Sequence, residues 1–142
     1  MQSNRSNTVF QPKRSCTRCD VAAPTARVWD AFKDVGAVHT RLAPGFVTAC
    51  RLEGSGRIVT FANGMTTREL IVDVDDRARR LVYSARSERL AHHNASFQVF
   101  ETGPASCRIV WIADLLPHEA AAPIGAMMQA GVAAMKQRLA SA

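Results

Sequence analysis

The sequence predicts an α+β fold in which a curved seven-stranded antiparallel sheet wraps around one long C-terminal helix. Three observations support this prediction. One strand-like and two short helical segments come first, six strand-like segments separated by turn signals follow, and a helical pattern over residues 118–140 comes last. The apolar face of an antiparallel sheet needs a cover, and only the last helix is long enough to provide it. We therefore expect an internal cavity between the sheet and this helix.

The length and composition fit one globular domain. The chain has 142 residues, of which 47% are hydrophobic and 21% are charged, and these values are ordinary for a single folded domain. Residues 1–12 are rich in Asn, Ser and Gln and have little to bury, so we expect a disordered lead-in there. The predicted domain therefore spans residues 13–142.

The first three elements are predicted from local patterns. Residues 13–22 suit a strand. A helix is expected over residues 25–36, with Thr25 as its N-cap and Gly36 at its C-terminal end. A second short helical segment is expected over residues 37–43.

Six further strands are predicted from the remaining middle of the chain. The turn signals GSG, NG, DDRA, SERLAH and TGPA separate them. Short strands with breaks at such intervals indicate an antiparallel sheet. The six segments cover residues 46–53, 56–62, 66–75, 79–86, 93–101 and 106–116.

Four stretches resemble a known family in the same order along the chain. They are VAAPTARVWDAFKDVG, TTRELIVDVDDRARRLVYS, CRIVWIADLLP and AGVAAMKQRL, and together they span about residues 14–140. The chain is similar to the START-like (SRPBCC) superfamily, which shares the helix-grip fold of the birch-pollen allergen, and within it to bacterial polyketide cyclase/dehydrase-like proteins. The resemblance implies a cavity for small hydrophobic or amphipathic molecules. Members include aromatic cyclases, lipid carriers and plant hormone receptors, so the fold alone does not choose a function.

The CxxC spacing of Cys16 and Cys19 does not predict a zinc or redox site. Both residues fall on the first strand, where residues three apart point to opposite faces. They therefore cannot share a metal ion or close an unstrained disulfide. Cys50 and Cys107 have no partner spacing. We expect four free thiols, no metal and no cofactor.

The charge and hydropathy of the chain indicate which partners to expect. The net charge is +6, but the Arg and Lys residues are scattered, so nucleic acid is not an expected partner. No apolar run is long enough to span a membrane, and no secretory signal is visible. We expect a cytoplasmic protein, a monomer or homodimer, whose partner is a small hydrophobic or aromatic ligand.

Glu69 is the first candidate site residue. It shares one face of its strand with Thr67 and Ile71, and periodicity alone would bury the opposite face, which carries Leu70 and Val72. The resemblance implies the reverse, because the Glu of this pattern faces the cavity in several relatives, notably the plant abscisic-acid receptors. The alternative is a Glu exposed to solvent beside Arg68.

Tyr83 and His93 are the next candidates. The family places an aromatic residue at the position of Tyr83, lining the pocket. His93 shares its face with Phe97, so we expect both in the pocket, and His93 adds a group that titrates near neutrality. Many relatives carry Asn-Tyr where this chain has His92 and His93, which puts inherited ligand contacts in doubt. Both candidates could instead be core residues with satisfied hydrogen bonds.

The last strand and the final helix complete the expected pocket. Either face of the last strand could be buried, and the alignment with relatives favours Val110 over Trp111 as the cavity residue. Trp111 on the outer face would then suggest a dimer. The turn that begins at Phe61 could gate the cavity mouth. On the helix, the expected pocket residues are Met127, Met128 and Gly131.

Three functions are compatible with these residues. The first is a binding or carrier protein that orients its ligand through Glu69, Tyr83 and His93. The second is an enzyme of the aromatic cyclase or dehydratase type, a lyase in which Glu69 or His93 is the general base and Tyr83 donates to a developing enolate. The third is a nucleic-acid or partner-binding module that uses its basic surface.

Overall fold

The computed structural model describes residues 13–140, so the disordered lead-in expected for residues 1–12 lies outside the described residues. Its elements, in chain order, are β1 (Lys13–Val21), α2 (Thr25–Lys33), the π-helix η1 (Val38–Leu42), β2 (Val47–Glu53), β3 (Gly56–Phe61), β4 (Thr66–Asp75), β5 (Arg80–Arg86), β6 (His92–Gly103), β7 (Ser106–Leu116), the 3₁₀ helix η2 (His118–Ala120) and α3 (Ala121–Ala140). This order confirms the predicted α+β class.

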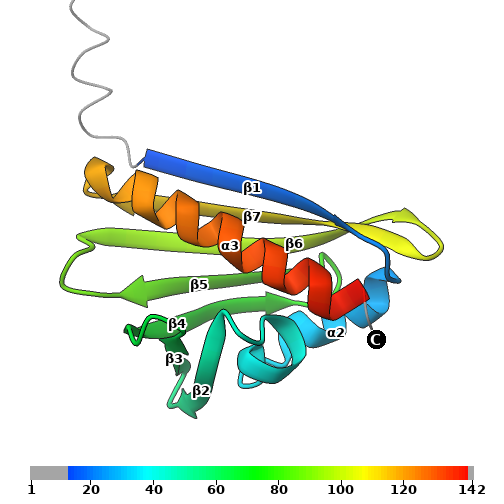
Figure 1. Cartoon of the computed structure of the whole chain (residues 1–142), viewed down its shortest axis with the longest axis horizontal. Helices are drawn as coiled ribbons and strands as arrows, with labels where there is room; N and C mark the ends of the chain where they lie inside the picture. Colours follow the sequence, from blue (N-terminus) through cyan, green and yellow to red (C-terminus); the bar gives the residue numbers. More distant parts are fainter. Residues whose placement is uncertain (1–12, 141–142) are drawn as a thin grey trace, which may run out of the picture.

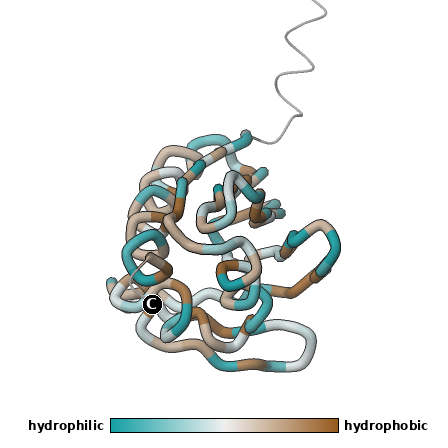
Figure 2. Tube along the Cα trace, turned by 90° about the vertical axis from the view of Figure 1, so that its right-hand side faces the viewer, coloured by the Kyte–Doolittle hydropathy of each residue, from teal (hydrophilic) through white to brown (hydrophobic). Residues whose placement is uncertain are grey.

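The strands form one seven-stranded antiparallel sheet in the order β1-β7-β6-β5-β4-β3-β2. Figure 1 shows α3 lying across one face of this sheet, with α2 and η1 near the C-terminal end of α3. Figure 2, turned by 90°, shows hydrophobic and hydrophilic residues interleaved along the trace as the strands bend round toward the helix. This is the predicted helix-grip arrangement.

The contacts of α3 explain why the sheet is not fully covered. The helix packs chiefly against β1 and η1, and only a few contacts reach β7. Its buried residues, Met128, Gly131, Val132, Met135 and Leu139, follow the predicted spacing of three or four. The middle strands therefore keep an inner face that α3 does not fill.

Two predicted features of the first helix are wrong. Pro24 occupies the N-cap position, because its carbonyl accepts the N–H groups of Arg27 and Val28. Thr25 is already helical, and its hydroxyl is buried without a hydrogen-bond partner. The helix also stops at Lys33, and Gly36 lies beyond it.

A bulge and two turns shape the edge of the sheet near the cavity. The register of β4 against β5 shifts between Ile71 and Asp73. Gly54 and Gly64 have φ values of 58° and 88° in the turns on either side of β3, where glycine avoids the strain of a left-handed conformation. These two glycines lie in the turn signals predicted from the sequence.

Among residues 13–140, no helix is both long and apolar enough to cross a bilayer.

Candidate ligand-binding cavity

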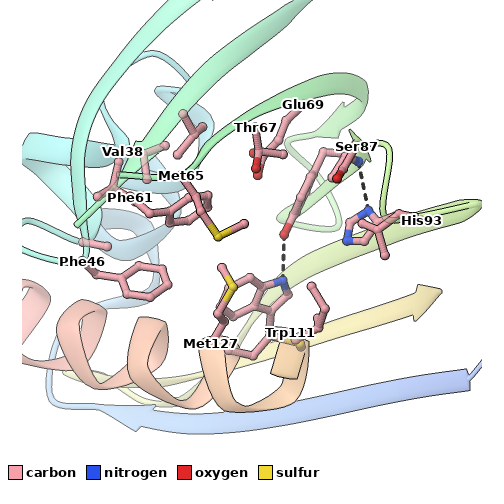
Figure 3. A pocket seen from close by; sticks show the side chains of 18 of the residues that line it. Val38, Phe46, Phe61, Met65, Thr67, Glu69, Ser87, His93, Trp111 and Met127 are labelled. Carbon is pink, nitrogen blue, oxygen red and sulfur yellow. Dashed lines mark hydrogen bonds between the residues drawn. The ribbon is translucent and has the colours of Figure 1, made fainter. Parts of the chain in front are cut away.

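A cavity of about 370 Å³ lies between the inner face of the sheet and α3. Figure 3 shows aromatic side chains at one end, with Phe46 and Phe61, and polar side chains at the other, with Glu69 and His93. The wall is formed by Val38, Leu42, Ala43, Phe46, Val47, Arg57, Val59, Phe61, Asn63, Met65, Thr67, Glu69, Tyr83, Ala85, Ser87, Arg89, Leu90, His93, Phe97, Trp111, Ala120, Pro123, Ile124, Met127, Met128 and Met135.

The opening of the cavity is marked by exposed wall residues. Asn63 and Met65 lie in and after the turn between β3 and β4, and Ser87 and Arg89 lie in the loop after β5. Met65 is 42% exposed, although it is apolar. Two loops from adjacent hairpins therefore flank the entrance.

The apolar end is built from aromatic and methionine side chains. The rings of Phe46 and Phe61 meet edge to face, with centroids 5.5 Å apart. Met127 and Met128 approach from α3, and Met65 approaches from the residue directly before β4. Because methionine side chains adapt to irregular shapes, this end can accommodate apolar groups of different outline.

Stacked aromatic rings form the floor of the cavity. The ring of Phe97 lies 4.4 Å from that of Trp111 and 5.9 Å from that of Tyr83, measured between centroids. The indole N–H of Trp111 donates a hydrogen bond of 3.0 Å to the Tyr83 hydroxyl. Burial raises the pKa of Tyr83, and the nearby Glu69 carboxylate raises it further, so the phenol stays protonated.

A buried ion pair forms the centre of the polar end. The Nε of Arg57 donates to Oε1 of Glu69 at 2.8 Å, and the two side chains are only 4% and 10% exposed. A second guanidinium nitrogen donates to the carbonyl of Val35 at 3.1 Å. The guanidinium also lies over the Tyr83 ring, 5.5 Å from its centroid. Glu69 is thus held by a cation that itself has partners on three sides.

His93 is held in one tautomer. The backbone N–H of Ala85 donates to Nδ1 of His93 at 2.9 Å, so Nδ1 carries no proton and the neutral ring has its proton on Nε2. Burial, with a smaller effect from His92, lowers the pKa of His93 to about 4. The side chain therefore offers an uncharged N–H donor to the cavity at neutral pH.

Most of the predicted pocket residues lie in the cavity wall. The structure places Phe61, Thr67, Glu69, Tyr83, His93, Phe97, Met127 and Met128 there. Their roles toward a ligand stay predictions, because no ligand is present. On β4, the family resemblance implied that Glu69 faces the cavity, and the structure agrees. Periodicity alone would have buried the wrong face of the strand, because Glu69 is 7% exposed whereas Val72 on the opposite face is 55% exposed.

Three predicted pocket residues are not in the wall, and each has a physical reason. Val110 lies on the outer face of β7, because its neighbours Ile109 and Trp111 point inward. Ile71 packs against the edge of the core beside the β4 bulge. A Cβ on Gly131 would lie 3.0 Å from the Trp111 ring, so this glycine lets an aromatic ring approach the helix and does not face the cavity.

The placement of Trp111 removes one argument for a dimer. Its ring forms part of the cavity floor and is 8% exposed. The argument required an exposed Trp on the outer face of the sheet. The monomer-or-homodimer expectation therefore stays a prediction without that support.

Arg57 and Phe46 are cavity residues that were not predicted from the sequence. Arg57 alternates with Val59 and Phe61 on the inner face of β3, and an arginine in phase with two apolar residues was a usable signal. Its pairing with Glu69 requires the register of the β3–β4 hairpin. Phe46 directly precedes β2 and carried no periodic signal.

The cysteines lie away from the cavity wall. Cys16 is exposed and Cys19 is half-buried on the opposite face of β1, in line with the strand alternation. Burial raises the pKa of the Cys19 and Cys50 thiols, so neither is an activated thiolate. Within residues 13–140, no three His, Cys, Asp or Glu side chains are grouped closely enough to hold a metal ion.

Comparison with known proteins supports the assignment of this fold. The family model described as "Polyketide cyclase / dehydrase and lipid transport" matches residues 15–140. No curated protein matches the chain.

Solved structures with the same fold are numerous. An uncharacterised protein from Bacillus thuringiensis superposes with a TM-score of 0.81 at 18% identity, covering 89% of this chain and 98% of its own. A START superfamily protein from Mycobacterium smegmatis has a TM-score of 0.75 at 12% identity, with coverages of 89% and 96%. The di-domain ARO/CYC protein BexL has a TM-score of 0.74 at 17% identity, and the match covers 89% of this chain and 46% of BexL. These likenesses establish the fold.

Proposed function

Because the chain belongs to the polyketide cyclase/dehydrase and lipid transport family, we propose that it binds a small hydrophobic or amphipathic molecule in the cavity beneath α3. The observation that carries this proposal is the two-ended wall, in which an apolar end and a compact polar end face one space of about 370 Å³. Ligand pockets commonly have volumes of about 300–1,000 Å³ and a few placed polar groups in an apolar wall. In this proposal residues 13–142 act as one ligand-binding domain in the cytoplasm.

The polar groups suit binding better than catalysis. Nδ1 of His93 is occupied by a backbone N–H, and Nε2 already holds the proton. One carboxylate oxygen of Glu69 is bound by Arg57. A general base needs a free lone pair within hydrogen-bond reach of the substrate proton. Only the second oxygen of Glu69 meets that requirement among the predicted catalytic groups.

The second candidate function is a cyclase or dehydratase reaction. A carboxylate in the cavity wall favours it, and so does the shared fold with an ARO/CYC protein. In this mechanism the second oxygen of Glu69 removes a proton next to a ligand carbonyl, and the Tyr83 hydroxyl donates to the enolate oxygen that develops. Turnover of a small ketone, lost in Glu69→Gln, separates this function from binding alone.

A thermal-shift screen with phenols, fatty acids and sterols tests the binding proposal. A ligand at 100 times its Kd adds about 2.7 kcal/mol of stability. We expect one class to stabilise the wild type and to lose its effect in Glu69→Ala and His93→Ala.

A matched pair of bulky substitutions shows whether a ligand occupies the cavity itself. Met127→Trp fills the cavity from α3, whereas Val72→Trp adds the same bulk on the exposed face of β4. We expect the ligand-induced increase in thermal stability to disappear only in Met127→Trp. A shift that survives Met127→Trp would place the ligand outside the cavity and contradict the proposal.

A further inference from the structure

The charges inside the cavity cancel. Arg57 and Glu69 are buried and paired, and the guanidinium is further engaged by the Val35 carbonyl and the Tyr83 ring. Within the described residues, Arg89 is the one other charged side chain of the wall, and it is exposed at the entrance. The buried polar end therefore has no unpaired cation to neutralise an anionic ligand.

Two uncharged donors lie beside this pair. His93 presents its Nε2–H to the cavity, because Nδ1 is bound to the backbone. The Tyr83 oxygen accepts the Trp111 N–H, and among residues 13–140 no acceptor is found for its own proton. The two rings lie 5.7 Å apart between centroids. Because both side chains line the same cavity, a ligand oxygen with two lone pairs has one donor available from each residue.

A carboxylate is a poor match for the same place. Such a ligand would lose its hydration on entry, and the loss is not repaid unless a free cation or several donors receive it. It would also lie next to the Glu69 carboxylate, and Arg57, which is already paired with Glu69, has no second charge to offset the ligand. A carbonyl oxygen has neither disadvantage and needs only the neutral donors that the wall supplies.

We propose that the cavity selects uncharged ligands that carry a carbonyl oxygen, bound by His93 Nε2–H and the Tyr83 hydroxyl, and that it discriminates against carboxylates. This inference rests on the proposed binding function. It specifies which end of the ligand lies at the polar end of the cavity, and it makes the Arg57–Glu69 pair the element that sets charge selectivity.

Three probes of nearly equal shape test the inference: 2-acetonaphthone, 2-naphthoate and 2-ethylnaphthalene. They place a carbonyl with a methyl group, a carboxylate or an ethyl group on the same ring system. Calorimetric titration of the wild type at neutral pH should give at least tenfold tighter binding of the ketone than of the carboxylate. The ketone should also bind more tightly than the hydrocarbon.

The Glu69→Gln variant tests whether the ion pair sets the selectivity. Removing the carboxylate leaves Arg57 as an unpaired buried cation, so the preference should reverse toward 2-naphthoate. Glu53→Gln is the matched control, because Glu53 pairs with Arg51 on the exposed face of the sheet. It should leave the ratio of the two Kd values unchanged.

The possible outcomes separate this inference from the binding function. If the wild type binds 2-naphthoate as tightly as the ketone, charge selectivity is wrong while the binding function stands. If 2-ethylnaphthalene equals the ketone, the carbonyl site is wrong and the binding function again stands. If none of the three binds but the thermal-shift screen finds a ligand, the carbonyl inference is wrong and the binding function stands; if neither experiment finds a ligand, both proposals are overturned. The wild-type comparison decides these points even if Glu69→Gln fails to fold.

Discussion

Arg57 and Glu69 lie directly opposite each other on β3 and β4, and their side chains meet at 2.8 Å inside the cavity wall. The register of the β3–β4 hairpin therefore determines that the charges at the polar end of the cavity are paired. The pair also links the cavity to the segment after α2, because the same guanidinium bonds to the Val35 carbonyl. A shift of β4 by one residue would turn Glu69 to the outer face and leave Arg57 buried without its partner.

Loss of Arg57 should strongly destabilise the fold. Arg57→Ala leaves the Glu69 carboxylate buried without its partner, which typically costs about 3–5 kcal/mol. Arg51→Ala removes an exposed pair with Glu53 and should cost at most about 1 kcal/mol. Urea unfolding of both variants gives the two values. Equal, small losses would show that the Arg57 pair is solvated.

The hydrogen bond between Trp111 and Tyr83 should appear as a coupling energy. Tyr83→Phe leaves the buried indole N–H without its acceptor, and this should cost about 1–3 kcal/mol. Trp111→Phe in the same background should then cost less than it does in the wild type. A double-mutant cycle by urea unfolding should give a coupling of about 0.5–3 kcal/mol. Additive losses would contradict an energetic role for this bond.

His93 should make stability depend on pH below neutrality. The folded protein holds the pKa of His93 at about 4, below the ordinary value of 6.5. Between these two values the unfolded chain binds a proton that the folded chain does not, so stability falls as the pH falls through this window and is unaffected above it. The groups around the ring are Tyr83, whose phenol stays protonated there, the paired Arg57 and Glu69, and His92 beside it in the chain.

The role of His93 is checked by measuring the free energy of unfolding of the wild type and of His93→Gln between pH 7 and pH 4.5. This range includes about two pH units of the window in which His93 titrates. The variant should lose much of the decline seen in the wild type. His92→Gln serves as the control, because His92 is exposed, and it should keep most of the wild-type slope, since His92 makes only the smaller contribution to the lowered pKa of His93. A wild-type slope that survives in His93→Gln would assign the pH dependence to other groups.

Two glycines of α3 should respond differently to alanine. A Cβ on Gly125 would meet the Ser15 hydroxyl at an ordinary 3.8 Å, whereas one on Gly131 would press on the Trp111 and Phe46 rings at 3.0 and 3.2 Å. Glycine costs up to about 1 kcal/mol relative to alanine inside a helix.

Gly125→Ala should therefore raise the free energy of unfolding by an amount approaching that value, and Gly131→Ala should gain nothing or lose stability. The shift of the aromatic rings should also weaken ligand binding in Gly131→Ala alone. Thermal unfolding and calorimetric titration measure the two effects. An equal gain in both variants would show that Trp111 and Phe46 are not packed against the helix.

The sequence was sufficient for the fold but not for every cavity position. Turn signals and the final helical stripe located the elements, since these patterns depend on local geometry. On β4 the periodicity favoured the wrong face: Val72 and Val74 are apolar but exposed, and Glu69 is buried through a partner on another strand. A buried charge is predictable only together with its partner, and that partner is set by register.

The last strand, β7, shows a second reason why the sequence did not predict every cavity position. Ile109 and Trp111 alternate with Val110 and Ile112, so both faces of β7 are apolar and periodicity could not choose between them. The structure resolves the choice through the contact of Trp111 with Tyr83 and Gly131. These contacts join residues far apart in the chain.

The most direct test of the central claim uses the methionine methyl groups. The chain has five methionines, and Met65, Met127, Met128 and Met135 all line the cavity. In a ¹³C-methyl-methionine NMR titration with 2-acetonaphthone, ligand binding in the cavity predicts saturable shifts of these four resonances with one common Kd. If the ketone binds by calorimetry while these four signals do not move, the ligand lies elsewhere and the cavity is not the binding site.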